Sequence, residues 1–324
     1  MKVLSAHSNN FFGIVPASLA HCTKLQLLDL SKNRFIGELP PYLSFFYDLR
    51  VLCLGYNKLH GIIPGWITNL TQLQVLDLSN NNFNGRIPSN LKTLKGFRIM
   101  GSSILHSGNT LYEDIRIIIK GFEYTLEYVL ATNTIFDLSN NNLVREIPLS
   151  IGTLSGLRLL NLSRNQIEGE IPASLGEIST TLEQLDLSRN NLSGVIPEDL
   201  IKLTSLADLD ISWNSLCGRI PKGTQLETFN QTSFEGNKCF CGYPLQKCKE
   251  SEKQNERAAG STNISIGRGW LNKVDEHFSL IALGLGMVIG FAGIVSMMIL
   301  LDKAKHWVMP PKTRPSYGLY IFPK

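Results

Sequence analysis

A block of about 24 residues recurs along the chain, and this repetition constrains the fold more than any other feature of the sequence. The clearest copy reads "LQLLDLSKNRFIGELP", with its asparagine at Asn33. Eight of the 14 prolines occupy one position of the block, so the copies share a single register. The same asparagine position recurs at Asn9 (in a partial copy), Asn57, Asn81, Asn141, Asn165, Asn190 and Asn214.

Each position of the block has a physical role. Leu-x-Leu alternation is typical of a short strand with one buried face. The asparagine can hydrogen-bond the backbone of a neighbouring block, glycine permits a tight bend, and proline fixes φ and ends strand pairing. One block cannot bury its leucines alone, so we expect a stack with a continuous core and a curved parallel sheet. Unrelated amphipathic segments, the alternative, would not repeat in register.

The block resembles the plant-type leucine-rich repeat, L-x-x-L-x-L-x-x-N-x-L-x-G-x-I-P, over residues 1–95 and 134–221. The resemblance implies an α/β-type solenoid, a right-handed superhelix with a parallel β-sheet on its concave face. Arg145 stands where the pattern has glycine, in "NNLVREIP". We therefore expect that coil to bend differently from the others.

One interval breaks the period. The interval from Asn81 to Asn141 is two and a half times the usual spacing, and the excess falls within residues 96–133. The stretch "DIRIIIKGFEYTLEYVL" is rich in isoleucine, tyrosine and phenylalanine, so we expect an ordered insertion: a strand, a turn at Gly121 and a short helix. It resembles the island of plant receptor-like proteins, which precedes the last four repeats and has a tyrosine before Lys-Gly. Here these are Tyr112 and Lys120–Gly121.

Residues 278–301 form an unbroken stretch of uncharged, mostly apolar side chains. As a helix they would span about 36 Å, enough to cross a bilayer; a buried helix of a soluble protein is the alternative. The basic tail, residues 302–324, predicts a single-pass type I protein of the plasma membrane with a cytosolic C-terminus. Small residues four apart predict a helix-packing face, although glycine is common in such helices: Ala282, Gly286 and Gly290.

The segments before the span are then extracellular, including a juxtamembrane stretch at residues 249–277. Asn-x-Ser/Thr sequons support this placement, and all of them precede the span: Asn69, Asn161, Asn191, Asn230 and Asn263. The first residues, "MKVLSAHSNN", lack the apolar stretch of a signal peptide and continue the repeat frame. We expect a truncated gene model or a shortened paralogue.

Residues 222–248 follow the last block and include "GTQLETFNQTSFEGNKCFCGYPLQKC". They resemble the C-terminal cap of plant leucine-rich-repeat receptor-like proteins, which implies a disulfide between Cys241 and Cys248. Cys239 departs from that pattern and is expected either to compete for pairing or to stay free. The pairing of the other cysteines stays open: Cys22, Cys53 and Cys217. Zinc is disfavoured because the cluster has neither a second Cys-x-x-Cys nor a nearby histidine.

No catalytic motif or cofactor site is visible, and we expect no enzyme activity. The net charge of +4 equals that of residues 302–324 and residues 249–277 are balanced, so residues 1–248 carry no net charge. Nothing in this distribution suggests a polyanion-binding domain, so we expect no nucleic-acid partner. The short tail is far from the length that a kinase domain needs.

The family resemblance implies an extracellular recognition receptor without its own kinase. It would bind a peptide, protein or glycan ligand, recruit a co-receptor leucine-rich-repeat kinase, and associate with an adaptor kinase through the membrane helix. A non-signalling relic or decoy and a leucine-rich-repeat enzyme inhibitor are the alternatives. Candidate contact residues, which could instead be ordinary surface or island core, are Tyr112, Lys120, Phe122 and Tyr124 in the island and Arg164, Arg189 and Trp213 on the concave face.

Overall fold

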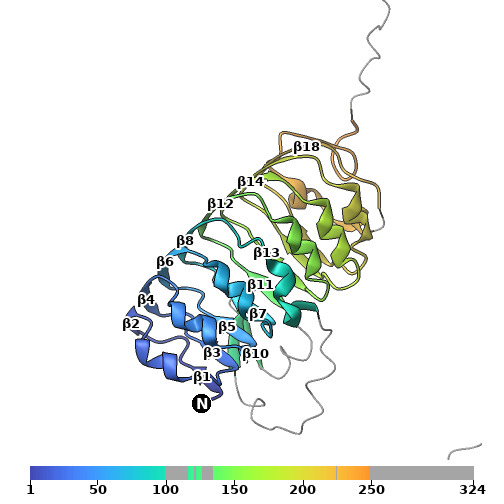
Figure 1. Cartoon of the computed structure of the whole chain (residues 1–324). Helices are drawn as coiled ribbons and strands as arrows, with labels where there is room; N and C mark the ends of the chain where they lie inside the picture. Colours follow the sequence, from blue (N-terminus) through green and yellow to red (C-terminus); the bar gives the residue numbers. More distant parts are fainter. Residues whose placement is uncertain (99–115, 120–121, 126–133, 224, 249–324) are drawn as a thin grey trace, which may run out of the picture. The chain divides into compact units, whose positions relative to one another are not determined.

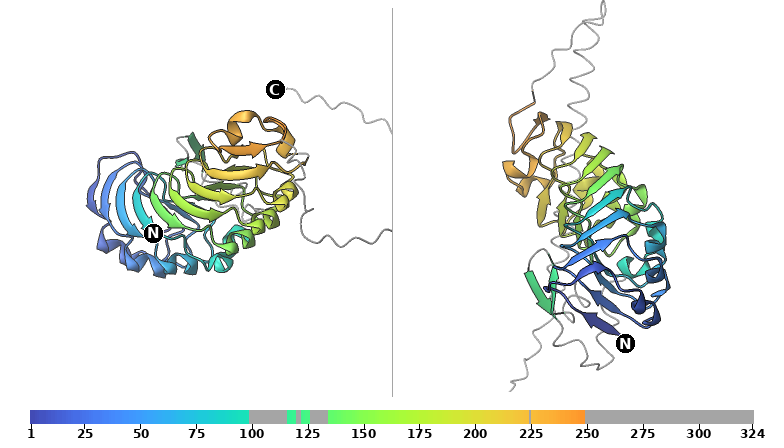
Figure 2. Two further views of the ribbon diagram at one scale, coloured as in Figure 1. Left: turned by 90° about the horizontal axis from the view of Figure 1, so that it is seen from above. Right: turned by 90° about the vertical axis from the view of Figure 1, so that its left-hand side faces the viewer.

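The computed structural model describes residues 1–98, 116–119, 122–125, 134–223 and 225–248. Successive blocks form coils stacked side by side, and short 3-10 helices gather along one side of the stack (Figures 1 and 2). Each full coil contributes one strand to each of two parallel sheets. The predicted leucine-rich-repeat solenoid with a parallel sheet is therefore present.

The first sheet is built from the Leu-x-Leu segments and has eight parallel strands. Its register carries each strand onto the equivalent residues of the next coil, as Leu28 onto Leu52. In spatial order its strands are β1 (Val3–Ser5), β3 (Leu27–Asp29), β5 (Val51–Cys53), β7 (Val75–Asp77), β11 (Ile135–Asp137), β13 (Leu159–Asn161), β15 (Gln184–Asp186) and β17 (Asp208–Asp210).

A second parallel sheet, with nine strands, forms from the segment between asparagine and proline. The repeat pattern predicts only the first sheet, because this segment has no period-two apolar pattern. In chain order its strands are β2 (Phe12–Ile14), β4 (Arg34–Gly37), β6 (Lys58–Ile62), β8 (Asn82–Gly85), β12 (Asn142–Arg145), β14 (Gln166–Glu170), β16 (Asn191–Gly194), β18 (Ser215–Arg219) and β19 (Cys239–Cys241).

Short 3-10 helices close most coils. Proline precedes six of them in the described residues, with φ between −59° and −70°, the range that the pyrrolidine ring imposes. The helices are η1 (Ala17–His21), η2 (Pro41–Phe45), η3 (Gly65–Asn69), η4 (Leu91–Thr93), η5 (Lys95–Arg98), η8 (Leu149–Thr153), η9 (Ala173–Ile178), η10 (Glu198–Lys202), η11 (Leu226–Thr228) and η12 (Gln231–Phe234).

The repeat asparagines join neighbouring coils through their side chains. Asn165 accepts a hydrogen bond from the backbone N–H of Leu143 (3.0 Å) and donates to the carbonyls of Leu138 (3.0 Å) and Leu162 (3.1 Å). Leu138 and Leu143 belong to the preceding coil, so one amide supplies partners for buried backbone groups on both sides. The leucines fill one continuous core between the two sheets and the helices.

The stack continues without a gap across the long interval. Strand β7 pairs directly with β11, with Val75 opposite Ile135, although the whole inserted segment separates them in sequence. Phe97 is fully buried in the core and its carbonyl accepts from the N–H of Gly156 at 2.8 Å. By its place in the frame, one repeat after Leu73, Phe97 serves as the first apolar residue of the coil that contains β11. The ordered coil therefore reaches Arg98, beyond the boundary at residue 95 that the sequence suggested.

Arg145 corrects the expectation of a differently bent coil. Its φ is 68°, close to the 74–96° of the glycines at the same position of the other coils. Its register is also regular, because Arg145 pairs with Ile167 as Gly61 pairs with Phe83. The coil keeps its shape at a cost of roughly 1–2 kcal/mol for a side chain in the left-handed region.

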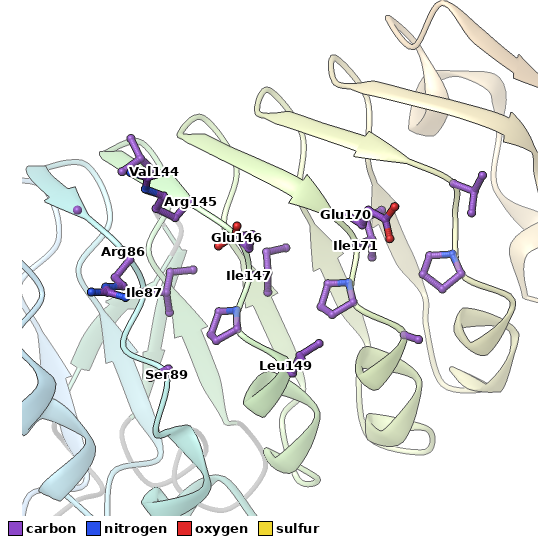
Figure 3. A pocket seen from close by; sticks show the side chains of 16 residues that line it. Arg86, Ile87, Ser89, Val144, Arg145, Glu146, Ile147, Leu149, Glu170 and Ile171 are labelled. Atoms are coloured by element: carbon purple, nitrogen blue, oxygen red, sulfur yellow. The ribbon is translucent and has the colours of Figure 1, made fainter.

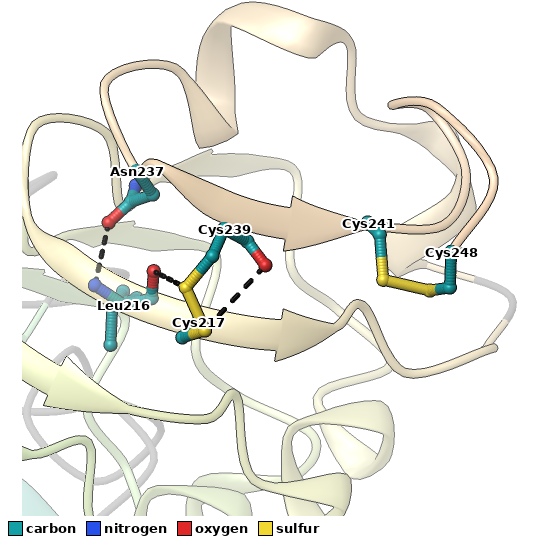
Figure 4. The surroundings of a disulfide bond; sticks show 6 residues. All are labelled: Leu216, Cys217, Asn237, Cys239, Cys241 and Cys248. Atoms are coloured by element: carbon teal, nitrogen blue, oxygen red, sulfur yellow. Dashed lines mark hydrogen bonds between the residues drawn. A yellow bond between two sulfur atoms is a disulfide. The ribbon is translucent and has the colours of Figure 1, made fainter. Parts of the chain in front are cut away.

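The segment after the last full repeat forms a ninth, degenerate coil. Strand β19 pairs with β18, and Asn237 repeats the asparagine bonds, accepting from the N–H of Leu216 at 3.0 Å (Figure 4). Two disulfides hold this cap coil: Cys217 is bonded to Cys239, opposite it in the sheet, and Cys241 to Cys248. Cys239 is thus paired, while Cys22 and Cys53 are free. The cap covers the last leucines because its Phe234 is buried in the common core.

The expected insertion is described only in part. Strands β9 (Arg116–Ile119) and β10 (Phe122–Thr125) pair antiparallel on either side of the expected turn, with Phe122 opposite Ile119. The expectation of a short helix directly after the turn is wrong for residues 122–125, which form β10, and residues 126–133 lie outside the described residues. The apolar stretch 278–301, with Ala282, Gly286 and Gly290, also lies outside them. Within the described ranges, no helix is both long and apolar enough to cross a membrane.

Candidate recognition surface

A row of exposed or partly exposed side chains lies just beyond the carboxyl ends of the strands of the eight-stranded sheet. It consists of the residue that precedes the ladder asparagine in each full coil, and all of these residues have left-handed backbone, with φ of 52–56°. The backbone N–H of each bonds to the next coil, as Arg164 N–H to the Ser188 carbonyl at 2.9 Å. From the second coil onward the members of this row, called here the corner row, are Lys32, Tyr56, Asn80, Asn140, Arg164, Arg189 and Trp213.

The structure brings the three candidates of the last repeats together in this row. Arg164, Arg189 and Trp213 lie on consecutive coils and all three are exposed. The Arg189 guanidinium lies 5.3 Å from the centre of the Trp213 ring, within cation–π range. Neither arginine makes an ion pair in the described part of the chain.

Trp213 is held from its other side by the cap. A Cβ at Gly236, the equivalent residue of the cap coil, would come within 2.8 Å of the tryptophan ring. Glycine there leaves room for the ring between the cap backbone and Arg189. Trp213 remains 49% exposed, so it offers an aromatic surface beside the Arg189 guanidinium, and Arg164 lies one coil further along the row. Such a surface suits a ligand with an acidic group next to an apolar or aromatic one.

The rest of the corner row was not singled out by the sequence analysis. Lys32 lies 5.8 Å from the centre of the Tyr56 ring, and the Asn140 amide donates to the Asn80 side chain at 2.8 Å. The signal that could have found them is positional, because each directly precedes a repeat asparagine. The row thus continues over seven coils.

A second row, of carboxylates, lies within the strands. In "LDLS" the aspartate accepts from the backbone N–H of the serine two residues later, as Asp77 from Ser79 at 2.9 Å. Burial first, and then the neighbouring Asp137 carboxylate, raise the pKa of Asp77 to about 7. Burial likewise raises the pKa of Asp29, an effect that its bonds to Ser31 oppose. These bonds explain the motif as a local turn device rather than a catalytic pair.

Cys53 replaces aspartate in this carboxylate row. Burial first, and then the carboxylates of Asp29 and Asp77, raise the pKa of the Cys53 thiol well above its usual value. The thiol therefore stays protonated and unreactive. Among the described residues no group of three or more His, Cys, Asp or Glu side chains could hold a metal ion.

The remaining candidates divide by location. Tyr112 and Lys120 lie outside the described residues, whereas Phe122 and Tyr124 belong to β10. Of the sequons, Asn69, Asn191 and Asn230 are exposed and Asn263 lies outside. Asn161 is a correction: it is 6% exposed on β13 and its amide donates to the Asp137 carboxylate at 3.3 Å. The fold leaves no room for a glycan there.

Comparison with known proteins agrees with this architecture. Two family models described as leucine-rich repeats match the chain, one over residues 36–83 and the other over residues 24–46, 134–154, 156–178 and 181–203. The chain is a leucine-rich-repeat protein. Over 164 residues it is 37% identical to Receptor-like protein 36 of Arabidopsis thaliana, and over 166 residues 32% identical to Receptor-like protein 34. Its family is that of the plant leucine-rich-repeat receptor-like proteins.

These alignments cover 50% of this chain and 17% of each relative, so the chain spans a small part of their length. Among solved structures, the ectodomain of the Arabidopsis receptor kinase HAESA with an extended IDA peptide hormone has a TM-score of 0.58 and 27% identity, covering 77% of this chain and 39% of HAESA. The ectodomain of GASSHO1/SCHENGEN3 with CASPARIAN STRIP INTEGRITY FACTOR 2 has a TM-score of 0.56 and 29% identity, covering 76% and 28%. Both neighbours are plant receptor ectodomains in complex with a ligand.

Proposed function

We propose that the chain is the membrane-proximal part of a recognition receptor without its own kinase. Its corner row and inserted segment contact a peptide ligand outside the cell. Signalling then depends on partner receptor kinases, one recruited as a co-receptor and one associated through residues 278–301.

The observation that carries this proposal is the exposed group Arg164, Arg189 and Trp213. Arg164 and Arg189 occupy the same position on adjacent coils, so their like charges disfavour one another, and no ion pair in the described residues neutralises either of them. An acidic ligand group between them would relieve that repulsion through charge-assisted hydrogen bonds. The peptide complexes of HAESA and GASSHO1/SCHENGEN3 support a peptide as the ligand class.

The decisive test is ligand-dependent recovery of a receptor kinase with the full chain. Plant cells expressing the tagged chain would be exposed to extracellular peptide fractions before precipitation. The variant R164A/R189A/W213A should lose the ligand-dependent kinase and keep normal abundance, because all three side chains are exposed. As a matched control, R34A removes an exposed arginine of the other sheet and should change nothing.

The membrane-helix proposal is tested in the same precipitation. G286L/G290L should reduce the kinase recovered without ligand, since larger side chains keep a partner helix at a distance. Unchanged recovery would reject the packing face. If no condition recovers any kinase from wild type, the non-signalling decoy becomes the better description.

A further inference from the structure

A groove lies on the nine-stranded sheet, at the ends of its strands where the 3-10 helices begin (Figure 3). It has a volume of about 1110 Å³ and crosses four coils, from Gly85 to Pro197. The corner row lies just beyond the carboxyl ends of the strands of the eight-stranded sheet, so the groove is a separate surface.

One of the repeats that line the groove has Arg145 at the position where the other described repeats have glycine. In the other coils the side chain directly after this position lies against the glycine of the next coil. A Cβ at Gly169 would meet the Cγ of Glu146 at 2.8 Å, and one at Gly194 would meet the Cγ of Glu170 at 2.9 Å. Arg86 occupies the position of Glu146 one coil earlier. The residue that it faces in the next coil is Arg145 instead of a glycine.

Arg86 and Arg145 therefore form a cationic pair at one end of the groove (Figure 3). Arg145 has a carboxylate neighbour, Glu168 at 3.5 Å, but both side chains are more than half exposed, so that ion pair is weak. Arg86 makes no ion pair in the described residues. This end of the groove can accept an additional carboxylate.

Apolar and acidic side chains together line the rest of the groove. Leu149 is 73% exposed and Val195 57% exposed, so both present apolar surface to the groove. The Glu146 and Glu170 carboxylates follow the arginines along the row of coils. The charges thus change sign along the groove, from cationic to anionic.

We propose that this groove binds an extended segment of a partner protein in which an acidic residue is followed, three positions later, by a basic one, with apolar residues between. Arg86 and Glu170 lie two coils apart, about 10 Å, which three residues of extended chain span. Recognition runs through side chains, because the strands beneath are already paired with both neighbours. The prolines that line the groove offer no N–H for strand addition.

The probe is a fluorescein-labelled peptide, Ser-Glu-Val-Val-Lys-Ser, titrated with the detergent-purified full chain and followed by fluorescence anisotropy. Wild type should bind it saturably below 1 mM, a range usual for a short peptide (about −4 kcal/mol at that limit). R86E should weaken binding about tenfold, and a peptide with lysine in place of glutamate should regain affinity for R86E. R34E, an exposed arginine of the same sheet outside the groove, should stay within twofold.

R145G is a second test variant whose fold should be intact, since it restores the glycine that this backbone conformation favours. It should weaken the peptide about fivefold. The proposal is overturned if wild type shows no saturable binding by 1 mM, a limit that corresponds to about −4 kcal/mol, if R86E binds as wild type does, or if a peptide with glutamine at both charged positions binds equally well. None of these outcomes depends on the corner row, whose variants should leave this binding unchanged.

Discussion

At the scale of single residues, the repeat is held by side chains that act as backbone partners. Each ladder asparagine serves three or four backbone groups of two coils, and the described copies from Asn33 to Asn237 do so with nearly the same distances. An apolar replacement would leave a buried N–H unpaired, which costs about 1–3 kcal/mol, and would take one of two donors from carbonyls such as that of Leu138. The asparagine therefore contributes more to stability than its small size suggests.

We expect N165A to lower the free energy of unfolding by about 2 kcal/mol, because the buried N–H of Leu143 loses its acceptor, while the carbonyl of Leu138 keeps one donor, the amide of Asn141. Urea denaturation followed by circular dichroism measures the change. N142A is the matched control: it removes an exposed asparagine of the preceding coil and should change stability by less than about 0.5 kcal/mol. Equal effects of the two variants would contradict the ladder argument.

The carboxylate row makes stability depend on pH. The pKa of Asp77 is about 7 in the folded protein, against roughly 3.9 in an unfolded chain. Between these values the folded state holds a proton that the unfolded state has released. The contribution of Asp77 is therefore most favourable below pH 4, and it is lost as pH rises through 7.

D77N should remove this dependence. Asparagine can keep the bond to Ser79, as Asn161 does with the N–H of Ser163 at 3.1 Å. At pH 8 the variant should be more stable than wild type by on the order of 1–2 kcal/mol, while near pH 4 the two should converge. Denaturant titrations between pH 4 and 8 measure the difference, and a difference that does not vary with pH would refute the assignment.

At the scale of elements, the cap coil has strands and an asparagine bond like the repeats but few of their leucines. It contributes Leu226 and Phe234 to the core, and Phe229, Phe240 and Leu245 pack against the core while partly buried. Little apolar burial is left to hold β19 at the edge of the sheet. The disulfide from Cys217 to Cys239 joins β19 to β18 and supplies that constraint.

C217S/C239S should therefore destabilise the cap more than C241S/C248S does. The first pair closes a loop with a sequence separation of 22 and the second one of 7, which the loop-entropy relation converts to about 3 and about 2 kcal/mol. Hydrogen exchange should show faster exchange at the amide of Leu216 in the first variant only. Faster exchange at that amide in both variants would mean that the cap opens as one unit.

At the scale of the whole molecule, the stack of coils continues unchanged across the insertion. Phe97 and Phe136 come from either side of the long interval and meet edge to face with ring centroids 5.8 Å apart. Phe97 is the last residue of the regular repeat before the insertion, and Thr134 is the first one after it. The Thr134 hydroxyl donates to the carbonyl of Gly156 in the next coil. The inserted segment is therefore an addition to the stack and not a part of it.

Deleting residues 98–133 should leave a cooperatively folded solenoid, since it joins Phe97 to Thr134 and restores the regular spacing of the repeat. A deletion of equal length placed at 96–131 would remove the buried Phe97 and should unfold the chain at lower urea. Under the proposed function the first deletion also abolishes recruitment of a co-receptor kinase. Recruitment that survives in the folded deletion would exclude the insertion as the contact.

The sequence by itself determined the number of full coils, their leucine core, the asparagine ladder and the place of the insertion to within a few residues. These features are local, because each follows from a pattern inside a single block. It also indicated Arg164, Arg189 and Trp213 as candidate contact residues. All three stand directly before a ladder asparagine. The sequence did not predict that this position has left-handed backbone.

Only the tertiary structure decided what depends on the register between coils. The second sheet, the pairing of Cys217 with Cys239, the use of Phe97 as a repeat leucine and the burial of Asn161 all join positions that lie on different coils. The groove beside Arg145 belongs here too, because it requires knowing which side chain of one coil faces which position of the next. Stacking creates these contacts, and no single block encodes them.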